Sequence, residues 1–129
     1  MSLVAVRIKD GQALNIYVLE ENGACELLSF LETVPETESA RLYKYLDRMA
    51  QSGPLRNTEQ SKPIAQGIFE LRTWGGLRVF CFYDEGKMVL CTNGYLKKRQ
   101  KLDSNAFRLA LTWKQKYFAA KQSGHLELQ

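Results

Sequence analysis

Histidine is nearly absent from this 129-residue chain, because His125, close to the C-terminus, is the only one. A positioned imidazole base, a nucleophile paired with histidine and a histidine-ligated metal are therefore not expected. Cysteine is also scarce: Cys25, Cys81 and Cys91 are widely spaced and form no C-x-x-C pair. This spacing supports neither a disulfide framework nor a zinc site, so we expect reduced thiols and no metal.

Long hydrophobic runs and nucleotide-binding motifs are missing too. No apolar run approaches the roughly 20 residues that a membrane helix needs, and residues 1–10 do not have the basic and apolar segments of an export signal. The sequence contains no G-x-x-x-x-G-K-[ST] and no G-x-G-x-x-G, and Gly75-Gly76 is interpreted as a turn. We therefore expect a cytoplasmic protein that has no membrane partner and no cofactor.

The composition is that of a globular protein, with 45% hydrophobic and 25% charged residues. The length predicts a single domain over residues 1–122, followed by a flexible tail over residues 123–129. The net charge of +4 is unevenly spread, because residues 97–129 carry eight basic against two acidic residues. This asymmetry suits a polyanionic partner, although a solvated basic helix face is its commoner cause.

The first half of the chain alternates between strand and helix patterns. Apolar residues at every second position predict a pair of strands within the first 19 residues. Helical spacing then predicts a short helix that ends at Pro35 and a longer one that stops at Gly53. Residues 55–62 are polar and unpatterned, so we interpret them as a loop.

The second half predicts a β-meander followed by a helix. Strand-like stretches at 67–73, 78–83 and 87–95 are separated by short glycine-containing turns, which favours antiparallel pairing. Asp103 or Ser104 is expected to cap the last helix. Its buried stripe is expected to include Phe107, Leu111, Tyr117 and Phe118. Together these elements predict an α+β fold, in which N-terminal strands and a helical hairpin pack on an antiparallel sheet with a C-terminal helix.

Charged residues within this meander are the candidates for chemistry. Glu70 and Arg72 share one face of a strand. If the following turn is the five residues 73–77, Arg72 pairs with Arg78 and both arginines project from that face, where they would repel each other unless an anion joins them. A four-residue turn would place them on opposite faces. The plain alternative is a surface ion pair between Glu70 and Arg72, worth under ~1 kcal/mol.

Aromatic residues alternate along the same strands, and most of them are expected to be core. Tyr95, beside the basic segment 97–101, is the one residue considered as a stacking surface for a nucleobase, although packing is the more common role of such a residue.

Three segments carry a family resemblance. They are Gly67-Ile-Phe-Glu-Leu-Arg72, Leu77-Arg-Val-Phe-Cys-Phe-Tyr83 and Gly94-Tyr-Leu-Lys-Lys-Arg-Gln-Lys101. In this order they resemble the RelE/ParE toxin superfamily, specifically its HigB-like, phage-derived branch. The resemblance covers roughly residues 14–121.

The resemblance implies a toxin of a type II toxin–antitoxin pair. It further implies a RelE-like fold and a metal-independent endoribonuclease, an mRNA interferase that cleaves mRNA on the ribosome and is neutralised by a helix-turn-helix antitoxin. A homodimer and a toxin–antitoxin hetero-oligomer both stay open. By resemblance, Arg72 and Arg78 would contact the scissile phosphate, and Lys98 matches the family's basic position after the third strand, which is also expected to be catalytic. Other residues would hold flanking RNA: Lys97, Arg99, Lys101 and Tyr95.

The sequence departs from the family pattern at several positions. Glu70 and Ile68 stand where the best-studied enzymes place lysines, and no tyrosine matches the one near the start of their last helix. Glu70 could serve as the general base, but a neighbouring arginine would weaken it in that role. These departures motivate an alternative, a ParE-like gyrase inhibitor or an inactive phage-derived binding domain.

Overall fold

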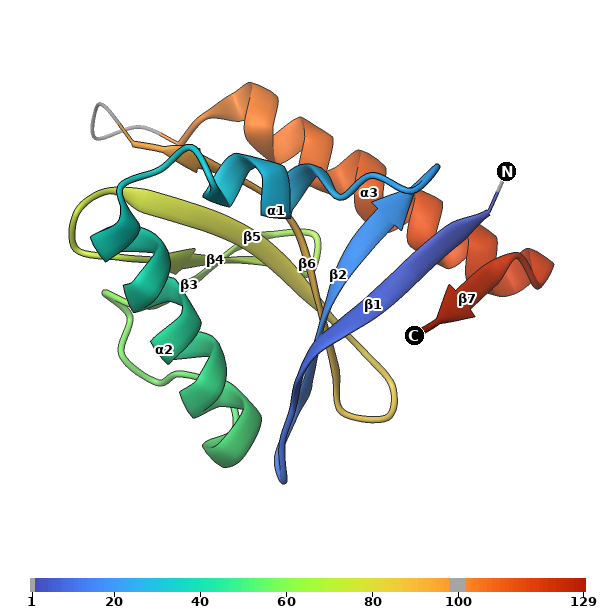
Figure 1. The fold of residues 1–129 in the computed structure, drawn as a ribbon, viewed down its shortest axis with the longest axis horizontal. Coiled ribbons are helices and arrows are strands. Elements are labelled where there is room, and N and C mark those ends of the chain that lie inside the picture. Colours follow the sequence, from blue (N-terminus) through green and yellow to red (C-terminus); the bar gives the residue numbers. More distant parts are fainter. Residues whose placement is uncertain (1, 98–101) are drawn as a thin grey trace.

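The structure is a computed structural model that describes residues 2–97 and 102–129 (Figure 1). Its elements in chain order are β1 (Leu3–Asp10), β2 (Asn15–Glu21), α1 (Glu26–Leu31), α2 (Glu36–Ser52), β3 (Ser61–Ala65), β4 (Ile68–Arg72), β5 (Leu77–Asp84), β6 (Met88–Leu96), α3 (Ser104–Ser123) and β7 (Leu126–Leu128). The predicted α+β class is confirmed, with two N-terminal strands, a helical hairpin, a sheet and a C-terminal helix.

A seven-stranded sheet with the order β3-β4-β5-β6-β2-β1-β7 forms the centre of the molecule (Figure 1). The predicted meander β4-β5-β6 and the opening pair β1-β2 are antiparallel. Two joins are parallel, β2 with β6 and β1 with β7. The sheet is therefore mixed. Parallel neighbours need a long crossover and no tight turn, so local sequence signals do not reveal them.

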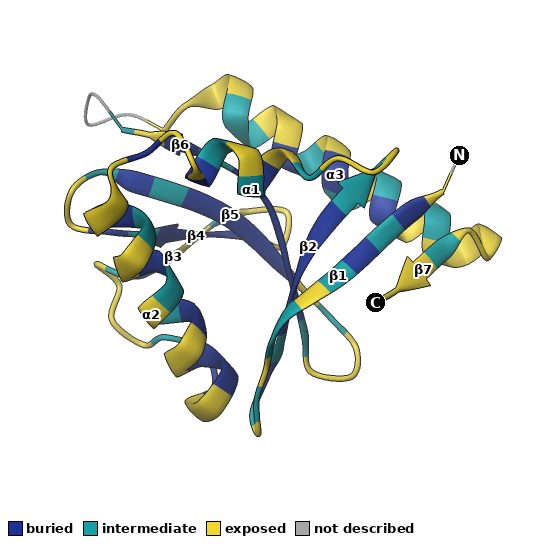
Figure 2. Cartoon of the chain, in the orientation of Figure 1, coloured by how far each residue is buried: buried dark blue, intermediate teal, exposed yellow. Residues whose placement is uncertain are grey.

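Helices cover both faces of this sheet and create two hydrophobic cores. On one face α1 and α2 pack against the strands, with Leu42 and Leu46 of α2 in the core. On the other face α3 packs against β5, with Trp113 and Tyr117 buried over Phe82. The inner faces of the helices and most of the central strands are buried, whereas the outer helix faces are exposed (Figure 2).

The predicted register of α3 needs a correction. Asp103 is the N-cap, as expected, and its carboxylate accepts from the amide of Ala106 at 3.0 Å. The fully buried positions are Ala110, Trp113 and Tyr117, and of these Tyr117 was expected. Phe107 and Leu111 lie at the margin of this face, and Phe118 is exposed. The helix has apolar residues on two adjacent stripes, so spacing alone did not identify the inner one.

The expected loop over residues 55–62 is present as far as residue 60, and its last two residues belong to a strand. β3 begins at Ser61 and pairs with β4 at the edge of the sheet. Gln66 and Gly67 join the two strands with positive φ angles of 52° and 79°, as in a two-residue hairpin turn. Pro63 is tolerated because an edge strand has one unpaired side.

The C-terminal segment, expected to be a flexible tail, contains β7. Gly124, at a φ of 79°, ends α3 and turns the chain back towards β1. Leu126 then lies opposite Leu3, and the amide of Gln129 donates to the carbonyl of Ala5 at 2.9 Å. Three residues are too few for a period-two pattern to show in the sequence. Among the helices described, none is long and apolar enough to span a membrane.

Candidate functional site

The hairpin β4-β5 brings the two candidate arginines together. Arg72 lies directly opposite Arg78 in the antiparallel register, as the five-residue turn requires. Their side chains and that of Glu70, two residues before Arg72, point to the face of the sheet that α3 covers. The open question about the register is thus answered in favour of a shared face.

The Glu70 carboxylate lies close to both arginines. Its Oε1 is 3.1 Å from Arg72 Nε and 3.8 Å from Arg78 Nε. The Glu70 side chain is only 2% exposed, so the expected surface ion pair is in fact buried. Separating a charge pair in such surroundings is far more costly than at the surface, because the remaining charge loses its partner without regaining water.

Tyr95 completes this buried cluster from β6. Its hydroxyl donates to Glu70 Oε2 at 2.7 Å, and its ring lies 5.7 Å from that of Phe80. Burial, followed by the hydrogen bond to Glu70, raises the pKa of Tyr95 well above its ordinary value. At 8% exposure the ring does not present a face for a nucleobase. The burial of Tyr95 thus speaks against the expected stacking, and its hydroxyl contacts Glu70 instead.

Two backbone carbonyls hold the Arg78 guanidinium in place. Its Nη1 donates to the carbonyls of Thr73 at 2.9 Å and Leu77 at 3.1 Å. Its buried Nε has no hydrogen-bond partner among the residues described. Burial, and then the neighbouring Arg72, lower the pKa of Arg78. The side chain is 12% exposed, so a cation that the backbone holds in place reaches the surface at this site.

Lys97 joins the arginines where β6 ends. Its amide donates to the carbonyl of Gly76 at 2.8 Å, which ties the end of β6 to the β4-β5 turn. Burial, followed by the charges of Arg78 and Arg72, lowers the pKa of Lys97. The structure thus brings together Arg72, Arg78, Lys97 and Glu70 of the predicted set. Three further predicted residues lie outside the described part of the chain: Lys98, Arg99 and Lys101.

Sequence reasoning missed Lys62. This residue lies opposite Glu70 in the β3-β4 register, and its charge is among those that depress the pKa of Lys97. The sequence predicted a loop there because Pro63 and the polar residues before it do not have the alternating apolar pattern of a strand. The pairing of β3 with β4 thus adds a fourth cation to the cluster, which we call the basic cluster: Lys62, Arg72, Arg78 and Lys97.

A second buried carboxylate fixes the turn between the arginines. Glu38 of α2 accepts hydrogen bonds from the Thr73 hydroxyl and, at 3.4 Å, from the Leu77 amide. Although burial favours the protonated form, these bonds and one from Arg41 at 2.6 Å keep the pKa of Glu38 below its ordinary value. A side chain at Gly75 would collide with this carboxylate. Helix α2 therefore holds the hairpin that carries the arginines.

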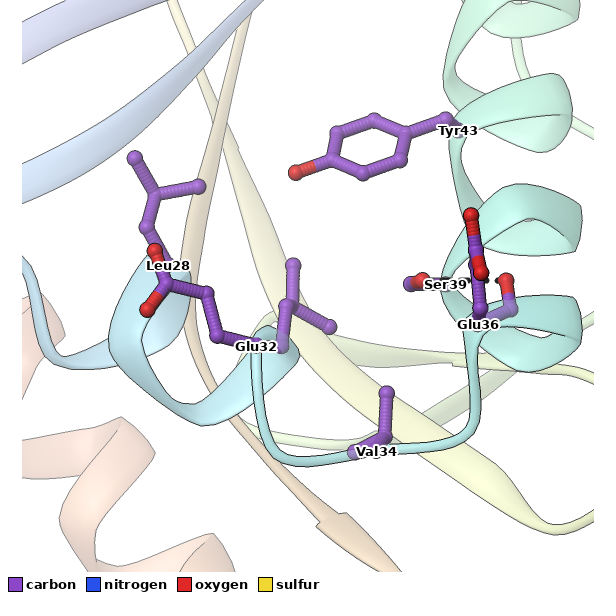
Figure 3. Close-up of a pocket in the computed structure, with 7 residues that line it drawn as sticks. Leu28, Glu32, Val34, Glu36, Ser39 and Tyr43 are labelled. Carbon is purple, nitrogen blue, oxygen red and sulfur yellow. Dashed lines mark hydrogen bonds between the residues drawn. The ribbon is translucent and has the colours of Figure 1, made fainter.

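The cavity between α1 and α2 has a different character (Figure 3). It has a volume of about 500 Å³ and lies over the other face of the sheet. Leu28 and Tyr43 line it, and two carboxylates, Glu32 and Glu36, border it. A polyanion would be repelled there, so the basic cluster is the better candidate for binding an anion.

These features define a class of protein: a mixed α+β domain that presents fixed cations at one end of its sheet. The family model described as "Phage derived protein Gp49-like (DUF891)" matches residues 29–115, so the chain belongs to this Gp49-like family. This membership confirms the predicted relationship to the phage-derived branch.

Among curated proteins, none matches the chain. A solved structure, the toxin–antitoxin complex RelBE2 from Mycobacterium tuberculosis, contains a chain with 17% sequence identity and a TM-score of 0.48. The alignment covers 64% of this chain and 95% of that chain.

Proposed function

We propose that this protein is the toxin of a type II toxin–antitoxin pair and that it cleaves mRNA on the ribosome. The observation that carries the proposal is the convergence of Arg72 and Arg78 from adjacent strands with Lys97 from the end of the next strand. Two buried carboxylates support this arrangement: Glu70 contacts Arg72, and Glu38 of α2 holds the turn between the arginines. A preorganised group of cations is what phosphoryl chemistry on RNA requires.

In the proposed reaction the RNA supplies its own nucleophile. The 2′-hydroxyl loses its proton to water, and its oxygen forms a bond to the adjacent phosphorus while the bond to the 5′-oxygen breaks. The departing 5′-oxygen takes up a proton from water, which leaves a 2′,3′-cyclic phosphate and a 5′-hydroxyl. Negative charge accumulates on the phosphoryl oxygens in the transition state, and Arg72 and Arg78 stabilise it. Lys97 and Lys62 attract the neighbouring phosphates. Lys98, Arg99 and Lys101 follow Lys97 directly in the sequence and extend this set in the proposal.

Glu70 acts in this proposal as a positioning residue. Both of its oxygens are engaged, one by Arg72 and the other by Tyr95, and the carboxylate is shielded from solvent. An RNA hydroxyl has no free oxygen of Glu70 to approach. The contacts instead keep two like-charged guanidinium groups close together, ready for a phosphate.

The partners follow from the same proposal. The antitoxin is a helix-turn-helix protein that neutralises the toxin, and the target is mRNA in the cytoplasm, where the ribosomes are. Homodimeric and hetero-oligomeric forms are separated by measuring the mass of the purified toxin with and without antitoxin.

Induced expression without antitoxin, followed by mapping of mRNA 5′ ends, tests the proposal. We expect new ends within translated regions for the wild type and none for the Arg72→Ala, Arg78→Ala double variant. Arg108→Ala is the matched control, because this exposed arginine lies on α3 and outside the basic cluster. Intact transcripts accompanied by inhibition of gyrase supercoiling would favour the ParE-like alternative instead.

A further inference from the structure

Trp74 is the most exposed large hydrophobic side chain among the residues described. It lies in the β4-β5 turn and is 91% exposed, whereas Trp113, the other tryptophan, is buried against the sheet. A tryptophan that folding leaves in water forgoes the large gain from burying its ring. Single exposed apolar side chains are common on protein surfaces, so the position of this ring in the fold decides what it can bind.

The backbone beneath this ring is fixed. The Thr73 amide donates to the Leu77 carbonyl at 3.0 Å, and the Gly76 amide donates to the Thr73 carbonyl at 3.2 Å. The buried Glu38 holds the Thr73 side chain and approaches Gly75 so closely that no Cβ fits there. The turn therefore presents Trp74 from a rigid base, which reduces the entropy lost on binding.

The same turn is tied to the basic cluster on both sides. Arg78 binds the carbonyl of Thr73, the residue before Trp74, at 2.9 Å. The backbone of Lys97 binds Gly76, two residues after Trp74. The exposed ring thus stands on the turn that joins the strands of Arg72 and Arg78. An aromatic ring together with cations binds single-stranded nucleic acid, because the cations hold phosphates while the ring stacks on a base.

We propose that Trp74 stacks on an unpaired nucleobase of the RNA strand whose phosphate Arg72 and Arg78 hold. This inference rests on the proposed function and deepens it, because it names the contact to the base. Every base has a flat π face, so the contact adds affinity without selecting a sequence. The ring also takes the role that the sequence had suggested for Tyr95.

Trp74 fluorescence provides a direct test. In a Trp113→Phe background Trp74 is the one remaining tryptophan, and the protein is titrated at low salt with a single-stranded RNA octamer. We expect quenching by the octamer and no quenching by an abasic octamer of the same charge. Since Trp113 also bonds Glu26 at 3.1 Å, RNA affinity is measured independently, by anisotropy of labelled RNA, on variants that retain Trp113.

In that second measurement Trp74→Ala should weaken RNA binding by roughly fivefold to a hundredfold, and Trp74→Phe by less. Unchanged affinity in Trp74→Ala, while Arg72→Ala still weakens binding, would overturn the stacking contact and leave the proposed function intact. If RNA affinity is unchanged and antitoxin binding is lost, Trp74 belongs to a protein interface instead. No RNA binding by the wild type would overturn the stacking contact alone, because the proposed cleavage takes place on the ribosome and is tested separately by mapping mRNA ends.

Discussion

Replacing Glu70 with glutamine removes the carboxylate that contacts both site arginines while keeping the shape of the side chain. The amide of Glu70→Gln can still accept a hydrogen bond, but it carries no charge against Arg72 at 3.1 Å and Arg78 at 3.8 Å. The two guanidinium groups then lie side by side on the paired strands β4 and β5 without a counterion. We therefore expect the folded state to lose stability.

The magnitude follows from the burial of the three groups. Removing one partner of a fully buried ion pair costs about 3–5 kcal/mol, because the other charge remains buried and unpaired. Here Glu70 is buried, but the side chains of Arg72 and Arg78 are 22% and 12% exposed, so solvent screens part of the repulsion. We expect a loss of about 2–3 kcal/mol in the free energy of unfolding.

Urea denaturation with and without inorganic phosphate measures this effect. A phosphate ion that enters the basic cluster can replace the missing carboxylate, so phosphate should stabilise Glu70→Gln more than the wild type. Glu85→Gln is the matched control, because this exposed glutamate lies in the turn at the far end of β5. If the Glu70→Gln protein is as stable as the wild type and gains no extra stability from phosphate, the Glu70 carboxylate does not neutralise the two arginines.

Three other substitutions test the support of the site. Because the pKa of Glu38 is lower in the folded state, its carboxylate stabilises the protein above pH 4.5, and this stabilisation is lost as the pH falls through the folded pKa. Glu38→Gln should therefore weaken the dependence of stability on acidic pH, as measured by urea titrations at several pH values. Gly75→Ala should lower the free energy of unfolding by about 1–3 kcal/mol through collision with that carboxylate, as measured by urea denaturation. Phe80→Ala should lower the thermal midpoint, at a cost of about 3–5 kcal/mol, because it empties a site between β5 and α3.

Elements with strong periodicity were predictable from the sequence. The helix that ends at Gly53 and the three strands of the meander have regular apolar spacing and glycine turns, and the structure contains them. The facing of Arg72 and Arg78 was one of two registers considered, and the turn geometry selected it. Local patterns thus predicted the meander on which the candidate site lies.

Exposure, in contrast, depends on tertiary packing that the sequence pattern does not report. Tyr95 lies beside a basic segment and seemed available for stacking, but Phe80 and Glu70 bury it. Trp74, interpreted as part of a turn, is the ring left in solvent. Lys62 joins the site only through strand β3, whose Pro63 and edge position conceal it from a period-two search.

The decisive experiment incubates the purified protein with ribosomes that are translating a defined mRNA and analyses the RNA ends produced. We expect the wild type to cleave the mRNA and leave a 2′,3′-cyclic phosphate, and we expect no cleavage by the Arg72→Ala, Arg78→Ala double variant. Cleavage that persists in the double variant, or intact mRNA with the wild-type protein, would contradict the proposed reaction.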